Sequence, residues 1–179
     1  MRNRLAIGLW CIGLMVSPLA RGHEDSILPL GSDGTLGGLP PKFSPAKLRI
    51  DFSDAQPRRV EAFVLTLSGG RIELPRCLLR TMTPRPRTDI RVLASWYHDP
   101  MPTLPYYVAV ELKAPASSDA RIPPASEMLL FNLETGRLLR FFRRIPIKDG
   151  YRDEPVDVHR LCAPAELKGR LDPAYQLDW

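Results

Sequence analysis

The stretch MLLFNLETGRLLRFFRR, residues 128–144, places two apolar runs on either side of the tripeptide ETG. Glycine at position 136 suits the positive φ that a tight turn between antiparallel strands requires. The pattern therefore predicts a β-hairpin. A single helix is the alternative, because Leu138, Leu139 and Phe142 also fall near helical spacing. A Thr-Gly pair in its middle would cost such a helix about 1 kcal/mol or more.

Both faces of the predicted hairpin are apolar. A type I turn followed by a bulge at Gly136 sets the register and therefore the faces. One face then carries Leu129, Phe131, Leu133, Leu139 and Phe141, and the other carries Met128, Leu130, Leu138 and Phe142. At about 1.5–3 kcal/mol for each buried side chain, their gross contribution reaches or exceeds the net stability of a typical domain. We expect this hairpin to lie at the centre of the fold, with cover on both faces.

Residues 1–22 have the layout of an export signal. Arg2 and Arg4 precede an apolar run at residues 5–16, and small residues with a proline follow it. The run is shorter than the roughly 20 apolar residues of a transmembrane helix, and no later stretch reaches that length without charges. We predict cleavage after Gly22, which makes His23 the first mature residue. The expected location is periplasmic or secreted, with no transmembrane segment in the mature chain.

The basic character of the whole chain comes mainly from this leader. The chain has 25 Lys and Arg residues against 20 Asp and Glu residues. Cleavage after Gly22 removes three arginines and no acidic residue, so the mature chain keeps 22 basic and 20 acidic residues. A net charge of +2 gives no reason to expect nucleic acid as a partner, because phosphate binding needs a concentrated basic face.

Two cysteines, Cys77 and Cys162, remain after cleavage. An even pair in an exported protein predicts a structural disulfide. Closing a loop of this length would stabilise the fold by about 4–5 kcal/mol in the chain-entropy model. A redox pair is the alternative, but neither cysteine lies in a C-x-x-C arrangement.

Short alternating runs separated by turns recur along the mature chain, and they predict an all-β fold. We expect an antiparallel β-sandwich of about seven or eight short strands, immunoglobulin-like in general architecture, with an open barrel as the nearest alternative. Residues 23–45 are rich in Gly and Pro and are expected to form an extended N-terminal segment, and residues 46–179 a single domain. Further short elements are expected as an edge strand at 77–80, a last strand at 156–161 and one helical turn at 165–168.

The loop HDPMPTLP, residues 98–105, contains three prolines. They would hold Tyr97, Met101, Leu104 and Tyr107 near one rim of the sandwich. A preordered aromatic and aliphatic rim loses little entropy on binding, so we predict a partner-binding surface there. The alternative is that the prolines only protect a strand edge.

A second loop, TMTPRPRT at residues 81–88, is basic and contains two prolines. It suits either contact with an anionic partner or a solvated connection between strands.

The usual catalytic motifs are absent from the sequence: there is no G-x-S-x-G, no phosphate-binding glycine loop and no H-E-x-x-H. This absence does not exclude an enzyme, but it removes the common reasons to propose one. We therefore expect a non-catalytic binding or accessory protein without a cofactor, which recognises a protein or a cell-envelope component.

His23 supports an alternative function. As the first mature residue it would offer copper both its α-amine and its imidazole, and His98 or His159 would supply a third nitrogen suited to Cu(II). This resembles the histidine brace of copper-dependent polysaccharide monooxygenases and periplasmic copper carriers, which implies a copper protein or copper enzyme. The resemblance covers one residue and the predicted fold class. If residues 156–161 form a strand, Asp157 shares a face with His159 and gives a second candidate metal or acid-base site.

Overall fold

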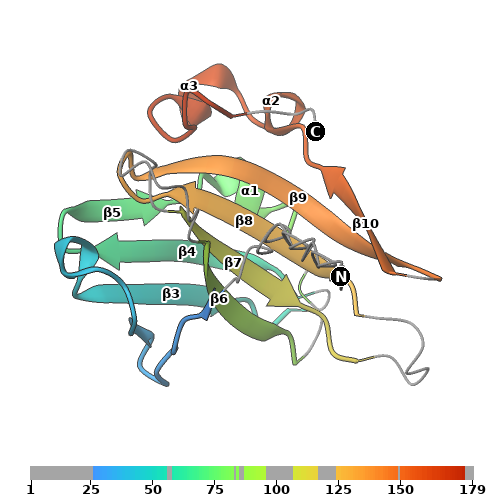
Figure 1. Ribbon diagram of the computed structural model, residues 1–179. Coiled ribbons are helices and arrows are strands. Elements are labelled where there is room, and N and C mark those ends of the chain that lie inside the picture. The colour runs from blue at the N-terminus through green and yellow to red at the C-terminus, as the bar shows by residue number, and fades with distance from the viewer. Residues whose placement is uncertain are drawn as a thin grey trace, which may run out of the picture.

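The computed structural model describes residues 26–55, 58–82, 84, 87–95, 107–116, 124–148 and 150–175. These residues form a mostly β structure of two antiparallel sheets with short helices at one end (Figure 1). The strands are β1 (Ser26–Ile27), β2 (Thr35–Leu36), β3 (Ala46–Phe52), β4 (Val60–Leu67), β5 (Gly70–Glu73), β6 (Asp89–Ser95), β7 (Tyr107–Lys113), β8 (Ser126–Asn132), β9 (Arg137–Ile147) and β10 (Gly150–Pro155). The helices are the 3-10 turn η1 (Pro41–Phe43), α1 (Arg76–Leu79), α2 (Val158–Leu161) and α3 (Pro164–Leu167).

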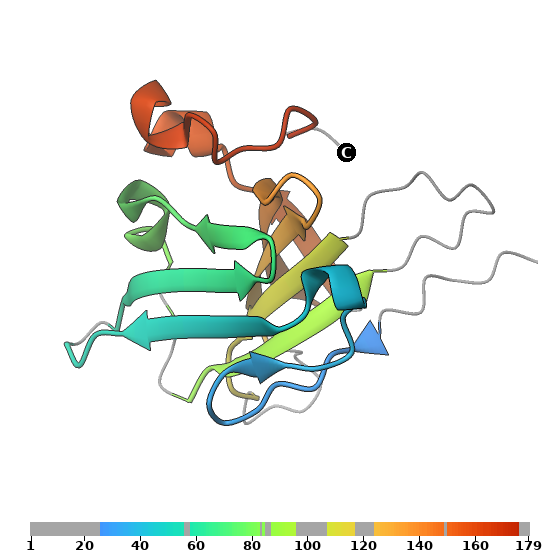
Figure 2. The ribbon, with the colours of Figure 1, turned by 90° about the vertical axis from the view of Figure 1, so that its left-hand side faces the viewer.

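One sheet has six strands in the order β1-β6-β7-β8-β9-β10, and the other has four in the order β2-β3-β4-β5. Figures 1 and 2 show the sheets as adjacent layers whose strands cross at an angle. Except at β1, strands follow chain order within each sheet, so each strand pairs antiparallel with the next one in sequence. Immunoglobulin sheets instead mix strands from distant parts of the chain. The described strands therefore do not show the immunoglobulin-like arrangement that we predicted.

The two sheets share one hydrophobic core. Phe63 of β4 and Phe131 of β8 stack across it with their ring centroids 5.3 Å apart. Both rings are at most 1% exposed, and Leu129 and Phe141 are buried to the same degree. Residues of β8 and β9 thus meet residues of the opposite sheet, so the predicted hairpin lies in the core.

The hairpin of residues 128–144 consists of β8 and β9, and its register differs in part from the prediction. The turn with a bulge at Gly136 predicts that Leu129 pairs with Phe141 and Phe131 with Leu139. Leu129 does pair with Phe141, but Phe131 pairs with Leu138. The reason is a four-residue turn at 133–136, with Gly136 at a φ of 66°, followed by a register shift that leaves Leu139 as the extra residue. Leu138 therefore takes the core position that we had expected for Leu139.

The other face of the six-stranded sheet carries a second, smaller apolar cluster. Its buried members are Ala109, Met128 and Phe142, and Leu93 and Leu130 pack against them. Both faces of the hairpin therefore contain buried apolar side chains, as the pattern of its sequence predicted.

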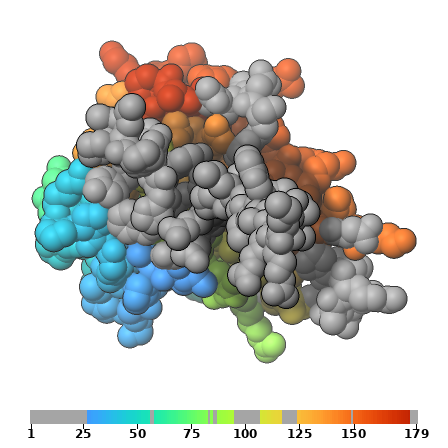
Figure 3. All heavy atoms as spheres, in the orientation of Figure 1, coloured from blue at the N-terminus to red at the C-terminus, as the bar shows by residue number. Residues whose placement is uncertain are grey.

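Two segments that we predicted as strands are helical. Residues 77–80 belong to α1 and the residue that follows it, and residues 156–161 contain α2. Pro75 precedes α1 as its N-cap, where proline lacks only a donor that the first turn does not use. The α2 and α3 helices lie above β9 in Figure 1 and along the top of the molecule in Figure 3. No helix in the described ranges is both long and apolar enough to cross a membrane.

The predicted disulfide is present between Cys77 and Cys162, whose Cα atoms lie 5.3 Å apart. Cys77 is in α1 and Cys162 is the C-cap of α2, so the bond joins two short helices 85 residues apart in sequence. Both helices also bury apolar side chains in the core, Leu78 and Val158 among them.

Candidate functional site

The predicted partner-binding rim lies mostly outside the described residues. Tyr97, Met101 and Leu104 fall outside them, whereas Tyr107 is the first residue of β7. Tyr107 is half-buried and pairs with Asn132 of β8. The location of this binding surface therefore stays a prediction.

Of the three predicted copper ligands, only His159 lies among the described residues. His23 and His98 fall outside the described residues. His159 lies in α2, where its ring packs edge-on against Tyr175 at 6.2 Å between centroids. Among the described residues, no three His, Cys, Asp or Glu side chains are grouped so that they could hold a metal ion. Copper binding stays a prediction.

Asp157 caps a helix and does not share a strand face with His159 as we predicted. It is the N-cap of α2, and its carboxylate accepts hydrogen bonds from the backbone N–H of His159 at 3.1 Å and of Arg160 at 3.3 Å. The same carboxylate lies 3.0 Å from the Arg160 guanidinium. Because the segment is a helix, the shared strand face that suggested an acid-base site does not form.

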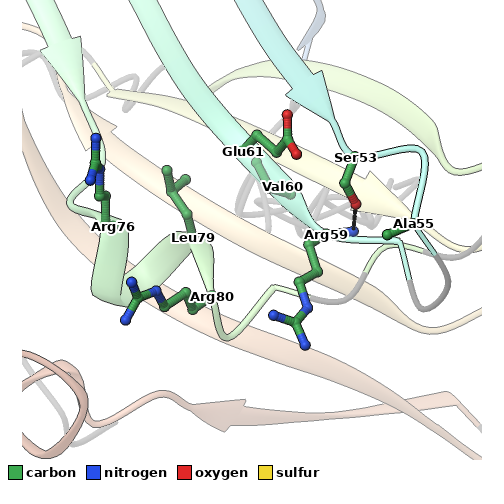
Figure 4. A pocket seen from close by; sticks show the side chains of 8 residues that line it. All are labelled: Ser53, Ala55, Arg59, Val60, Glu61, Arg76, Leu79 and Arg80. Carbon is green, nitrogen blue, oxygen red and sulfur yellow. Dashed lines mark hydrogen bonds between the residues drawn. The ribbon is translucent and has the colours of Figure 1, made fainter.

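A cleft of about 500 Å³ lies between the start of β4 and α1 (Figure 4). Its volume falls within the roughly 300–1,000 Å³ that is usual for ligand sites. The lining residues come from the β3–β4 loop, the start of β4, and α1 with the residue after it. They are Ser53, Ala55, Arg59, Val60, Glu61, Arg76, Leu79 and Arg80.

The cleft exists because β5 is short. It pairs only with residues 64–67 of β4. Leu74 still donates a backbone hydrogen bond to the Phe63 carbonyl at 3.4 Å, and Pro75 then turns the chain into α1. The first residues of β4 are therefore bordered by β3 on one side and by the cleft and α1 on the other.

The floor of the cleft is apolar and belongs to the hydrophobic core. Val60 is 4% exposed and Leu79 is 6% exposed, and both belong to the shared core. Figure 4 shows the Leu79 side chain extending from α1 toward β4. A ligand in the cleft would contact a surface that the fold already holds in place.

Three exposed arginines line the cleft: Arg59 before β4, Arg76 at the start of α1 and Arg80 directly after it. Within the part of the chain that the structure describes, none of the three forms an ion pair. Their guanidinium groups point in different directions (Figure 4). Glu61 is the acidic residue of the lining, so positive charge predominates.

Many of the other arginines are neutralised by a neighbouring carboxylate. The arginine-carboxylate pairs are Arg49–Asp51, Arg71–Glu73, Arg91–Asp89, Arg143–Glu127, Arg144–Asp153, Arg152–Glu154 and Arg160–Asp157. Exposed pairs of this kind contribute little to stability, but they occupy the guanidinium group. The arginines of the cleft keep their donors available to a ligand.

A hydrogen-bonded pair and the disulfide restrain the backbone at Arg59 and Arg76. The Arg59 N–H donates to Ser53 Oγ at 2.9 Å, drawn in Figure 4, and its carbonyl accepts from the Ser53 N–H at 2.9 Å. Arg76 precedes Cys77 in α1, so the disulfide restrains the turn that carries it. The guanidinium groups of these two arginines therefore extend from backbone that the fold holds in place.

Sequence reasoning did not find this cleft because its charged residues are separated along the chain. The nearest signal was the basic loop at residues 81–88, which begins directly after Arg80. Arg143 of β9 donates to the Thr81 carbonyl at 2.9 Å and holds the start of that loop beside the opposite sheet.

No protein-family model, curated protein or solved structure matches this chain. The fold and the site define a protein of two antiparallel sheets that presents an arginine-lined cleft.

Proposed function

We propose that this protein is an exported, non-catalytic accessory protein that binds an anionic group of a partner protein or envelope component in the cleft between β4 and α1. The observation that carries the proposal is the set of Arg59, Arg76 and Arg80, exposed and without ion pairs among the described residues. Guanidinium groups form charge-assisted hydrogen bonds with carboxylates and phosphates. The apolar floor adds contact area beside these charges.

The proposed compartment is the periplasm or the cell exterior. It is supported by the leader-like residues 1–22 and by the Cys77–Cys162 disulfide, because disulfides persist in oxidising compartments. The proposed scaffold is a β-sandwich, supported by the single core that both sheets share. A mature net charge of +2 is only a slight basic excess, so we do not propose nucleic acid as the partner.

Binding is favoured over catalysis by the chemistry of the lining. The Ser53 hydroxyl accepts a hydrogen bond from the Arg59 N–H and so fixes the rim. The remaining polar side chains of the lining are guanidinium groups and one carboxylate, Glu61. Such a set recognises negative charge and offers no activated nucleophile.

The test is a titration of the processed protein with citrate and with inorganic phosphate, followed by NMR of the arginine side chains. Saturable shifts are expected at Arg59, Arg76 and Arg80. An Arg80→Glu variant should bind at least tenfold more weakly, because one charge-assisted hydrogen bond contributes about 1.5–3 kcal/mol. Absence of saturable binding in the unmodified protein would contradict the proposal.

Lys148→Glu is the matched control. Lys148 is exposed at the connection between β9 and β10, away from the lining, and its replacement changes the net charge by the same amount. We expect less than a twofold effect on anion affinity. Equal weakening by both variants would mean that diffuse charge, and not the cleft, attracts the anion.

A further inference from the structure

We infer that the anionic ligand of this cleft is an acidic segment of a partner protein that lies extended beside β4, in line with β5, as an added strand. This inference rests on the proposed function and names the chemistry of the partner. It follows from the part of β4 that β5 leaves uncovered, and from the backbone groups and charges found there.

The cleft lies where β5 would continue if it were longer. β5 covers residues 64–67 of β4, and the chain then leaves the sheet at Pro75. The start of β4 pairs with β3 on one side, as in the contact of Val60 with Phe52. On its other side is the cleft, of about 500 Å³. An extended peptide would complete the sheet at this position by β-strand addition.

The backbone of β4 directs hydrogen-bonding groups toward the cleft. Arg59 uses both its N–H and its carbonyl on Ser53, on the β3 side. Successive residues of a strand direct these groups to alternate sides, so the N–H and carbonyl of Val60 point to the side of the cleft. Further along β4, the Phe63 carbonyl points to the same side, because it accepts from the Leu74 N–H of the chain that follows β5. Val60 and Phe63 can share this side because the register shift between the pairs Phe52–Val60 and Asp51–Ala62 leaves Glu61 as an extra residue, which reverses the alternation. Val60 is therefore the expected anchor of an added strand.

The side chains of the cleft suit alternating residues of such a strand. Apolar residues would face the floor at Val60 and Leu79, and acidic residues would face the rim. The rim arginines come from both walls, and their guanidinium groups diverge (Figure 4). This spread matches several separate carboxylates better than one compact anion. Glu61 would repel a carboxylate at its own position and so favours one register.

A phosphate polymer is the competing ligand, and the cleft favours the peptide for two reasons. The floor is apolar, which suits aliphatic side chains and offers nothing to phosphate oxygens. The Val60 carbonyl can accept only from a donor such as a peptide N–H, which a phosphate chain lacks.

The experiment uses the processed full-length protein and a blocked peptide of sequence EVEVE as the probe. A QVQVQ peptide controls for charge. Two further EVEVE peptides are N-methylated, one on its valines and one on its glutamates, because alternate N–H groups of a strand face opposite sides. Tripolyphosphate serves as the competing polyanion, and Arg80→Glu and Lys148→Glu serve as the protein variants.

We expect EVEVE to bind at least tenfold more tightly than QVQVQ, with the Val60 amide resonance among those that shift. Only one of the two N-methylated peptides should lose binding, by tenfold or more. Arg80→Glu should weaken EVEVE about tenfold and Lys148→Glu less than twofold.

Equal affinities of both N-methylated peptides and of EVEVE, or tighter binding of tripolyphosphate than of EVEVE, would overturn strand addition and leave the anion-binding cleft standing. Failure of citrate, phosphate, tripolyphosphate and EVEVE alike to bind would overturn the proposed function as well.

Discussion

Cys77 is bonded to Cys162 at a Cα separation of 5.3 Å, and this bond restrains the helix from which Arg76 enters the cleft. α1 has four residues, and an isolated helix of that length does not persist in water. Its position depends on tertiary contacts, namely the disulfide and the fully buried Leu78. The bond therefore supports both the fold and the site.

Replacing both cysteines with alanine should lower the free energy of unfolding by about 2–5 kcal/mol, because the cross-link restricts the unfolded chain. It should also weaken anion binding, since α1 loses one of its anchors. Urea denaturation and citrate titration measure the two effects. Unmodified protein treated with dithiothreitol should behave like the double variant. A reduced protein that keeps its full stability would contradict this account.

The buried carboxylate of Asp172 joins the chain after α3 to the turn between β8 and β9. Asp172 is 6% exposed. It accepts hydrogen bonds from Asn132 Nδ2 at 3.0 Å and from Thr135 Oγ1 at 2.7 Å. Asp172→Ala would leave the Asn132 amide short of an acceptor in a buried position, which costs about 1–3 kcal/mol. Urea denaturation of this variant checks the loss.

Thr135→Val is the control for that experiment. It removes one donor to Asp172 but leaves the Asn132 contact in place, so its destabilisation should be the smaller of the two. If Thr135→Val proved as destabilising as Asp172→Ala, the contact between Asn132 and Asp172 would not be what secures the segment after α3.

The sequence was sufficient to predict the elements whose pattern is long and regular. The hairpin of β8 and β9 followed from its two apolar runs and Gly136, and the disulfide followed from the two cysteines left after the leader. The predicted register of the hairpin was wrong by one residue near the turn, because a bulge at Leu139 leaves the hydrophobic pattern almost unchanged. Alternation alone cannot distinguish such a bulge from a regular ladder.

The helical turn expected at residues 165–168 is present as α3 (Pro164–Leu167), but α1, α2 and the cleft were beyond sequence reasoning for a different reason. Four residues are about one turn, so α1 and α2 contain no helical period to detect. Asp157, two residues before His159, suggested a shared strand face but is the N-cap of α2. The cleft combines Arg59 with residues of α1. They come together because β5 stops pairing with β4 at residue 64 and leaves the start of β4 beside α1.

Stability above pH 10 should depend on Tyr175. Its hydroxyl donates to the Val156 carbonyl at 3.0 Å, and burial raises the pKa of Tyr175 from 10.0 to about 12. Because the folded state holds the proton more tightly, this contribution is complete below pH 10 and is lost as the pH rises through 12. Between pH 9 and 11 the free energy of unfolding should fall by roughly 1–2 kcal/mol more in the unmodified protein than in Tyr175→Phe.

Chemical denaturation at pH 9, 10 and 11 measures that difference. Tyr151→Phe is the control, because Tyr151 is 40% exposed on the edge strand β10. Its pH profile should follow that of the unmodified protein. A Tyr175→Phe profile that is also unchanged would show that Tyr175 is not protected from ionisation in the fold.

The processed N-terminus decides between copper binding through His23 and a purely anion-binding role. We expect the intact mass of the exported, unreduced protein to match residues 23–179 less two hydrogen atoms, because cleavage after Gly22 leaves a free His23 amine and the disulfide removes two protons with their electrons. Any other N-terminus would remove the histidine brace, since the α-amine would belong to a different residue.

If the mass shows a free His23 amine, a copper titration then tests whether the protein binds copper. Binding tighter than millimolar that His23→Ala abolishes would establish copper as a ligand, and its absence would exclude the brace. His159→Ala should leave copper content unchanged, because the His159 ring packs on Tyr175 and its backbone N–H is held by the Asp157 cap. Loss of copper in that variant would instead place His159 within reach of the N-terminus and make the end of α2 part of a metal site.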